Sequence, residues 1–165
     1  MNAFVNIRRL MLLGPFGFMS CLTGCISVPL GAPVGVLNPA FEGQQLVIYR
    51  LPDNASLYFD GLLNGVPTKD YIKRGGVLIV PVPSGNHTFT VKIPAFFPSS
   101  SMSANLVSVE VKPRERKFIR VRTASGGTET RWGTSGVVAG QYNYVVEEVS
   151  QKMAEIEIRE LKFVN

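Results

Sequence analysis

Short runs of β-branched and aromatic residues recur along most of this chain, and they constrain its fold more than any other feature. Each run is bounded by Gly, Pro, Asn, Asp or Ser, which are the residues that favour turns. Runs of this kind at near-regular spacing predict an all-β fold in which antiparallel strands form a sandwich. The expected strands are Gln44–Arg50, Ser56–Asp60, Gly76–Val82, His87–Ile93, Asn105–Val111, Lys117–Thr123 and Gly140–Val149.

The C-terminal stretch QKMAEIEIRELKF, residues 151–163, fits two structures. Ile156 and Ile158 alternate with charged residues, which favours a strand, whereas the content of Ala, Glu, Leu and Lys favours a helix. Both alternatives stay open from the sequence. We therefore expect one mainly β domain over residues 44–165, a prealbumin-like or immunoglobulin-like antiparallel β-sandwich, either with or without a short C-terminal helix.

The first 24 residues have the pattern of a secretory signal peptide. A pair of arginines precedes an apolar run over residues 10–22, which is shorter than the roughly 20 residues that a membrane-spanning helix requires. The run ends in the letters LTGC, Leu22 to Cys25, which resemble the bacterial lipobox, where a cysteine is acylated and becomes the new N-terminus. The resemblance implies lipidation of Cys25. The alternatives are an ordinary secretory signal with a chance cysteine and an uncleaved apolar anchor.

Cysteine usage and charge exclude several classes of function. Cys21 leaves with the signal and Cys25 is consumed by lipid, so the mature chain has no free thiol for a disulfide, a nucleophile or a metal. Signal removal lowers the number of Lys and Arg residues from 17 to 15 against 12 Asp and Glu, and a charge of about +3 does not favour nucleic acid. Ile26 stands where inner-membrane lipoproteins often carry Asp, so the resemblance implies an outer-membrane anchor facing the periplasm.

Residues 25–43 connect the lipidated cysteine to the domain. Their sequence from Ile26 to Gly43 is rich in proline and glycine and has no strict period. We interpret this segment as a tether, which, if flexible, holds the domain on the order of 20–25 Å from its anchor. In the alternative arrangement its valines and leucine pack along the domain or lie on the lipid surface, since linkers are usually more polar than this one.

The stretch VPSGNHTFTV contains Ser84-Gly85-Asn86-His87, the four letters that name a superfamily of hydrolases. In those enzymes the four residues come from separate sequence blocks on an α/β fold, and this chain lacks the necessary alternation of strands and helices. His87 is the single histidine, and no acidic residue stands two or three positions before it. Between two expected strands, the stretch fits a hairpin turn. We expect no catalytic residue, no cofactor and no metal site.

Two motifs carry a resemblance to a family. The first is Tyr58-Phe59-Asp60-Gly61, and the second consists of Val82, Pro83, Gly85, His87 and Thr88. They resemble a bacterial lipoprotein domain of unknown function that is similar to PEGA-type modules. The resemblance spans about Leu46 to Thr123 and implies a small β-sandwich on a lipid anchor, without established enzymatic activity, in which Asp60-Gly61 and Ser84-Gly85 serve turn geometry. Ser84 departs from the usual second proline, and segment 93–104 is longer than the family pattern.

Six basic residues gather in VKPRERKFIRVR, around one expected hairpin. One hypothesis is a patch that contacts anionic lipid head groups, lipopolysaccharide or an acidic polymer. The alternative is a solvated sheet edge whose charges prevent pairing between molecules, and the interruption by Glu110 and Glu115 favours it. Arg120 and Arg122 share a strand face and are the candidate contacts. The six residues are Lys112, Arg114, Arg116, Lys117, Arg120 and Arg122.

Three aromatic residues are further candidates for contact with a partner or ligand. Phe96 and Phe97 lie between two prolines, where they either present a rigid anchor to a partner or cover an open end of the sandwich. Trp132, the single tryptophan, lies in a glycine-rich stretch and either stacks on a sugar ring or packs against the core.

The sequence therefore predicts a lipid-anchored envelope protein that acts as a non-enzymatic accessory or protein-interaction module. Its expected partners are the membrane, through the N-terminal lipid, and another envelope protein, through Phe96, Phe97 or a sheet edge. The alternative is a glycan-binding module that uses Trp132 and the basic residues on peptidoglycan or lipopolysaccharide. An enzyme is the poorest of the three hypotheses.

Overall fold

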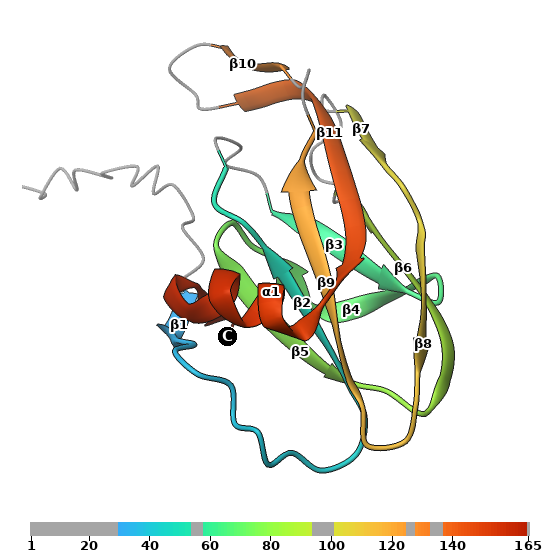
Figure 1. Ribbon diagram of the computed structural model, residues 1–165. Coiled ribbons are helices and arrows are strands. Elements are labelled where there is room, and N and C mark those ends of the chain that lie inside the picture. The colour runs from blue at the N-terminus through green and yellow to red at the C-terminus, as the bar shows by residue number, and fades with distance from the viewer. Residues whose placement is uncertain (1–29, 54–57, 94–100, 125–127, 133–136, 165) are drawn as a thin grey trace, which may run out of the picture.

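The computed structural model describes residues 30–53, 58–93, 101–124, 128–132 and 137–164. Within these ranges the chain forms two packed β-sheets and a short C-terminal helical segment (Figure 1). The larger sheet has the strand order β1 (Leu30–Pro33), β12 (Lys162–Val164), β5 (Gly76–Pro81), β2 (Gln45–Arg50), β9 (Arg116–Thr123), β11 (Val137–Val149) and β10 (Thr128–Trp132), with β7 (Ser101–Ala104) also paired to β11. The smaller sheet has the order β4 (Val66–Ile72), β3 (Phe59–Leu63), β6 (Gly85–Lys92) and β8 (Val107–Val111).

The prediction of an all-β sandwich is confirmed. Most strand pairs are antiparallel, but the larger sheet also contains the parallel pairs β2 with β9, β5 with β12 and β7 with β11. Parallel neighbours need a long crossover connection. For β2 and β9 that connection passes through all four strands of the smaller sheet.

The core between the two sheets consists of apolar side chains from both. Leu46, Ile48 and Ile119 of the larger sheet and Phe59 and Phe89 of the smaller one are fully buried there. Burying a large apolar side chain contributes about 1.5–3 kcal/mol relative to leaving it in water. The period-two alternation expected for one-sided strands is present in β6, where His87, Phe89 and Val91 are buried and their neighbours are more exposed.

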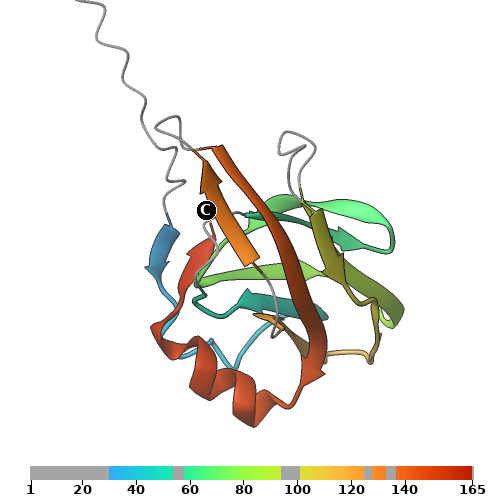
Figure 2. The ribbon, with the colours of Figure 1, turned by 90° about the horizontal axis from the view of Figure 1, so that it is seen from above.

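Strand β2 is buried on both of its faces, because the larger sheet carries a second core on the side away from the smaller sheet. Val47 and Tyr49 point into this second core, where they meet Ala154 and Ile158 of the C-terminal helical segment. Figure 2, seen from above, shows this segment on the outer side of the larger sheet and β1 at the edge of that sheet, next to β12. The apolar run in QLVIYR is therefore typical of a strand covered from both sides.

The C-terminal stretch that fitted both strand and helix contains both. It forms α1 (Gln151–Glu157), a 3-10 turn η1 (Ile158–Glu160) and then β12. The Ser150 hydroxyl caps the helix by accepting from the Met153 backbone amide at 3.4 Å. Ala154 and Ile158, four residues apart, are its buried residues and face the sheet, as expected for one stripe of a helix.

The two connections expected to be hairpins instead cross between the sheets. Strand β5 belongs to the larger sheet and β6 to the smaller, so Ser84 lies in an inter-sheet turn; Gly85, with φ of 135°, begins β6. Likewise β8 and β9 are in different sheets, and Arg114 in their connection has φ of 60°. Turn chemistry was recognisable from the sequence, but the partner of each strand was not, because pairing is decided by the packing of the whole sandwich.

Strand β4 was missed from the sequence although a clear signal preceded it. Asn64 and Gly65 have φ of 52° and 78° and connect β3 to β4 as a two-residue hairpin, the loop for which Asn-Gly is the strongest short signal. Gly61, expected in a turn, lies instead within β3 where the register with β4 shifts. A Cβ atom there would lie 2.8 Å from the Thr68 hydroxyl and 3.1 Å from the Phe89 ring, so close packing requires glycine.

The segment that is longer than the family pattern, residues 93–104, supplies β7. This strand runs parallel to β11. Its pairing is extended by the Asn105 side chain, whose amide donates to the Val146 carbonyl at 2.6 Å and accepts from the Val146 backbone amide at 2.8 Å. Residues 101–104 of this segment thereby become part of the larger sheet.

Residues 30–43, for which we favoured a flexible tether, pack along the domain. Strand β1 pairs with β12, and Val34 and Leu37 are buried in the second core. Further along, the Phe41 ring lies 4.0 Å from the Arg116 guanidinium. The apolar residues that made this segment unusual for a linker cover the outer face of the larger sheet, which is the second arrangement considered for it.

Candidate functional site

Of the residues predicted to contact a partner or ligand, Arg120 and Arg122 have described side chains. Cys25, Phe96 and Phe97 lie outside the described residues. Trp132 ends strand β10, where its backbone pairs with Val137, and the structure describes nothing of its side chain. Arg120 and Arg122 lie on β9, between β2 and β11 in the interior of the larger sheet, so the interpretation of this strand as a sheet edge is wrong.

Arg120 and Arg122 are paired with glutamates from β11 and α1. Arg120 Nη2 lies 2.9 Å from Glu147 Oε1, and Arg120 Nη1 lies 2.5 Å from Glu157 Oε1. Arg122 Nε donates to the same Glu147 oxygen at 2.6 Å. The two arginines therefore form an ion-pair network on the outer face of the sheet, and their charge is neutralised within the protein.

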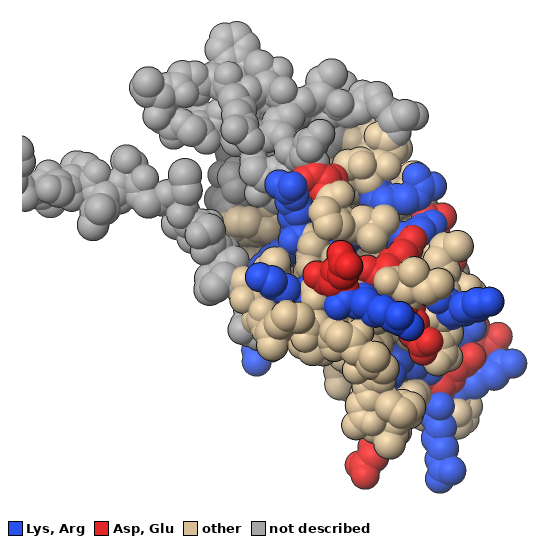
Figure 3. Space-filling view, turned by 60° about the vertical axis from the view of Figure 1, so that its left-hand side comes forward, with Lys and Arg blue, Asp and Glu red and all other residues tan. Residues whose placement is uncertain are grey.

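Figure 3 shows basic and acidic side chains interspersed on this face, without a continuous basic area. Burial pushes the pKa of Glu147 upward, but its hydrogen bonds with Arg122 and Arg120 outweigh burial and hold that pKa below its ordinary value. Burial likewise opposes the charge of Arg120, yet Glu147 and Glu157 raise its pKa. The acidic residues that the sequence placed on a helix or strand surface are thus the partners of the basic ones.

Tyr49 ties this network to the core beneath helix α1. Its side chain is fully buried, and its hydroxyl donates to Glu157 Oε2 at 2.5 Å. Burial raises the pKa of Tyr49 strongly, and the hydrogen bond and negative charge of Glu157 raise it further. Glu157 therefore holds α1 in place through Tyr49 and Arg120 together.

We expect the domain to lose stability at alkaline pH through Tyr49. The pKa of this hydroxyl is higher in the folded than in the unfolded chain, so its contribution is fully present below the ordinary value of 10.0 and is lost as the pH rises above it. The slope is at most about 1.4 kcal/mol per pH unit. The free energy of unfolding, measured with denaturant at several pH values in this range, should fall less steeply with pH for Tyr49→Phe than for the natural chain. Tyr71→Phe, which removes a 38% exposed phenol, is the control; equal slopes in all three proteins would contradict the expectation.

His87 is a structural residue of the turn between β5 and β6. The ring is buried, Nδ1 lies 3.1 Å from the Asn64 side-chain nitrogen, and Nε2 lies 2.8 Å from the Pro83 carbonyl oxygen. Asn64 Oδ1 accepts from the Thr88 backbone amide at 2.9 Å, so its nitrogen is the group facing His87 and must donate to Nδ1. Nε2 then carries the proton and donates to Pro83. Both ring nitrogens are engaged, and His87 connects the turn to the β3–β4 hairpin.

Replacing His87 with alanine should lower the free energy of unfolding by about 1–3 kcal/mol, the usual cost of leaving buried hydrogen-bonding groups unsatisfied. The measurement is equilibrium unfolding in urea. Asn86→Ala, at the exposed neighbouring position of the same strand, is the matched control and should change the stability little. A His87→Ala protein as stable as this control would show that the bonds to Asn64 and Pro83 do not matter.

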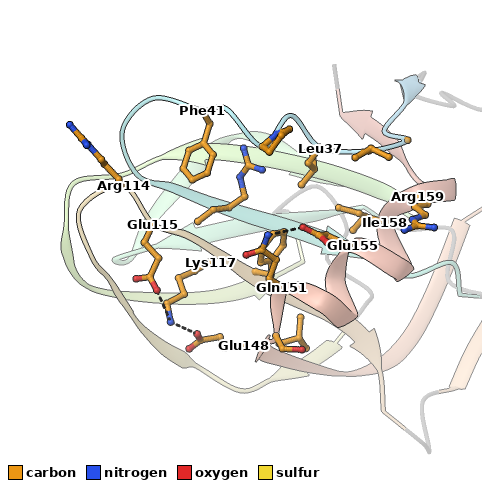
Figure 4. A pocket seen from close by; sticks show the side chains of 17 residues that line it. Leu37, Phe41, Arg114, Glu115, Lys117, Glu148, Gln151, Glu155, Ile158 and Arg159 are labelled. Atoms are coloured by element: carbon orange, nitrogen blue, oxygen red, sulfur yellow. Dashed lines mark hydrogen bonds and ion pairs between the residues drawn. The ribbon is translucent and has the colours of Figure 1, made fainter.

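A groove of about 480 Å³ lies on the outer face, between the N-terminal segment, the start of β9 and helix α1. Figure 4 shows Leu37 and Phe41 of the N-terminal segment on one side of the groove and Lys117 on the opposite side. Ile158 of the helical segment lies at the end of the groove near Leu37. Lys117 bridges Glu148 at 2.9 Å and Glu115 at 3.5 Å on one side of the groove. The volume of the groove falls in the range of ligand-binding sites, about 300–1,000 Å³.

Arg116 is the distinctive charged group of this groove. Gln45 Oε1 accepts from its Nε and Nη2 at 3.2 and 3.0 Å, and the Asn38 carbonyl accepts from Nη1 at 3.1 Å. These acceptors are neutral, and no carboxylate of the described residues lies within 4 Å of this guanidinium. Burial lowers the pKa of Arg116, and Glu155, acting from a greater distance, only partly opposes this. Arg116 thus differs from Arg120 and Arg122 in forming no ion pair with a carboxylate of the described residues.

A second arginine, Arg50, lies fully buried at the end of β2. It makes two hydrogen bonds with the Asp53 carboxylate, at 2.7 and 3.0 Å, and a third with the Tyr144 hydroxyl at 3.0 Å. Its guanidinium lies 4.3 Å from the centre of the Phe59 ring. The sequence did not predict this cluster. Its local signal is weak, consisting of the opposite charges of Arg50 and Asp53 three residues apart. Its enclosure indicates a role in stability.

The described residues contain neither a metal-binding cluster nor a membrane-spanning helix. No group of three or more His, Cys, Asp or Glu residues in these ranges is arranged to hold a metal ion. Among the helices of the same ranges, none has the length and apolar character needed to cross a membrane. In comparisons with known proteins, no family model, no curated protein and no solved structure matches this chain.

Proposed function

We propose that this chain is a lipid-anchored protein of the bacterial envelope and acts as a non-enzymatic protein-interaction module. The observation that carries the proposal is the groove between the N-terminal segment, β9 and α1. Apolar and charged side chains alternate around it, and Val36 on its rim is 82% exposed. A partly apolar, charge-rimmed depression of this kind suits a protein segment.

The anchor lies close to this groove along the chain. Strand β1 begins at Leu30, five residues after the lipidated Cys25, and a fully extended chain covers at most about 3.6 Å per residue. Leu30 is therefore within about 18 Å of the anchor. This distance is shorter than the roughly 20–25 Å expected between anchor and domain for a flexible tether of residues 25–43. In this proposal the groove, which begins at Gly35, stays near the periplasmic surface of the outer membrane and meets partners there.

The charge distribution favours a protein over a glycan as partner. The glycan-binding alternative relies on Arg120 and Arg122 to attract anionic sugars, and Glu147 and Glu157 already neutralise those charges. Ion pairs inside the network would have to break before these arginines reached a saccharide. The groove needs no such rearrangement.

Site-specific photo-cross-linking in intact cells tests the proposal. A photoreactive amino acid at Val36 should capture one envelope protein in defined stoichiometry, identified by mass spectrometry. The same amino acid at Glu110, an exposed position on β8 of the smaller sheet, is the control and should capture none. Recovery of wall or lipopolysaccharide fragments alone from the Val36 position would reject the protein-interaction module and support the glycan binder.

A further inference from the structure

Arg116 and its groove also point to the chemistry of the bound segment, an inference that rests on the proposed function. A guanidinium has five N–H donors, and the bonds to Gln45 and Asn38 use three of them. One N–H therefore remains on each terminal nitrogen. Because a partly desolvated cation is most stable beside an anion, the remaining donors match an acceptor that carries negative charge.

The surroundings of Arg116 select among anions. Four basic residues and three acidic ones line the groove, a net charge of about +1 that a singly charged group balances and a doubly charged group such as phosphate exceeds. They are Arg114, Arg116, Lys117 and Arg159 against Glu115, Glu148 and Glu155. Lys117 offsets part of the acidic charge, since it bridges Glu115 and Glu148. A singly charged carboxylate matches the net charge of the groove and can still form two short hydrogen bonds with the guanidinium.

The rest of the groove selects what the carboxylate is attached to. Leu37, Phe118 and Ile158 are buried apolar residues whose side chains line it, and Phe41 stacks on Arg116. An apolar group next to the carboxylate would fill this space. At the rim, the exposed Gln151 and Glu155 side chains, 2.7 Å apart, offer partners to peptide amides, which favours a peptide over a fatty acid.

We propose that the groove binds the free C-terminus of a partner protein, with the terminal carboxylate on Arg116 and an apolar last side chain against Leu37, Phe118 and Ile158. The carboxylate would approach the two remaining N–H groups of Arg116 and place a negative charge in direct contact with the guanidinium, which no carboxylate of the described residues does. An extended chain would leave the groove past Gln151 and Glu155.

The test is the binding of a labelled peptide to the full chain as isolated from cells. The probe is fluorescein-Gly-Gly-Ala-Ala-Leu with a free C-terminal carboxylate, compared by fluorescence anisotropy with the same peptide as a C-terminal amide. Loss of charge-assisted hydrogen bonds should weaken the amide roughly 10- to 100-fold. Arg116→Gln should abolish the preference, whereas Arg74→Gln, the same change at an exposed turn position, should retain it.

A second variant keeps the inference testable if Arg116→Gln does not fold. Glu155→Gln removes an exposed negative charge that acts on Arg116 and keeps a side-chain oxygen that can accept from a peptide amide, so the ratio of carboxylate-peptide to amide-peptide affinity should rise about two- to threefold. Equal binding of the two peptides, or binding of neither, would overturn the inference. Carboxylate-dependent binding of laurate but not of the peptide would overturn it in favour of a fatty acid.

These outcomes are separate from the test of the proposed function. Cross-linking of one envelope protein at Val36 together with equal binding of both peptides would reject the C-terminal carboxylate and leave the interaction module standing. Cross-linking of glycan alone would reject the module whatever the peptides do.

Discussion

Replacing Asp53 with alanine is expected to lower the free energy of unfolding by about 3–5 kcal/mol, the usual cost of breaking a buried ion pair by removing one partner. Arg50 is fully buried and makes two hydrogen bonds with the Asp53 carboxylate. The substitution removes that counter-charge while the guanidinium stays buried beside the Phe59 and Tyr144 rings. The loss is a large fraction of the stability of a typical domain, about 5–15 kcal/mol. Urea unfolding measures it.

A double variant distinguishes lost charge from lost packing. Arg50→Met with Asp53→Ala removes both charges and keeps an apolar side chain in the same space, a replacement that is often neutral for buried ion pairs. It should therefore be more stable than Asp53→Ala alone. Glu110→Ala, at an exposed position on β8, controls for loss of a carboxylate and should change the stability little. An Asp53→Ala protein with the stability of that control would refute the role given to the pair.

Replacing Cys25 with serine is expected to abolish lipid attachment completely, because the hydroxyl of serine is a far weaker nucleophile than a thiolate. Cells grown with alkyne-labelled palmitate should label the natural chain and not the variant. Mass spectrometry of the N-terminal peptide should find the natural chain beginning at an acylated Cys25, and the variant still carrying residues 1–24.

Cys21→Ser is the matched control, since it removes the other cysteine of the chain, four residues earlier. It should keep the full palmitate label. Label retained by Cys25→Ser, or lost from Cys21→Ser, would contradict the lipid anchor and with it the envelope location that we propose. The Val36 cross-link and the groove would then need a partner from another compartment.

The strands that could be predicted from the sequence are those with strong local signals. QLVIYR and KFIRVRT are rich in β-branched and apolar residues and became β2 and β9 nearly as expected. The strands β1 and β12, by contrast, are short, and each is formed against distant partners: β1 pairs with β12, and β12 also pairs with β5. Residues 30–43 have the proline- and glycine-rich composition of a linker. They belong to the domain because their apolar side chains pack on the apolar outer face of the larger sheet, which would otherwise be exposed to water.

The candidate site was predictable in its residue types but not in its arrangement. The sequence places Arg116, Arg120 and Arg122 within one basic stretch. Nothing local distinguishes Arg116, which faces neutral acceptors, from Arg120, which meets Glu147 and Glu157 from elements more than 25 residues away. Counter-charges come from register across strands and from the docking of α1, and both are properties of the assembled sheet.

What the sequence determined by itself is the all-β class and a chain reversal around Pro83 and Ser84, together with the lipobox pattern at Cys25 that awaits its test. These depend on interactions between neighbours in the chain, such as β-propensity and turn geometry. Only the tertiary structure decided which strands pair, which of the basic residues on β9 form ion pairs and where the groove opens. Those features depend on contacts between distant segments, which become favourable only when both sheets and α1 have packed together.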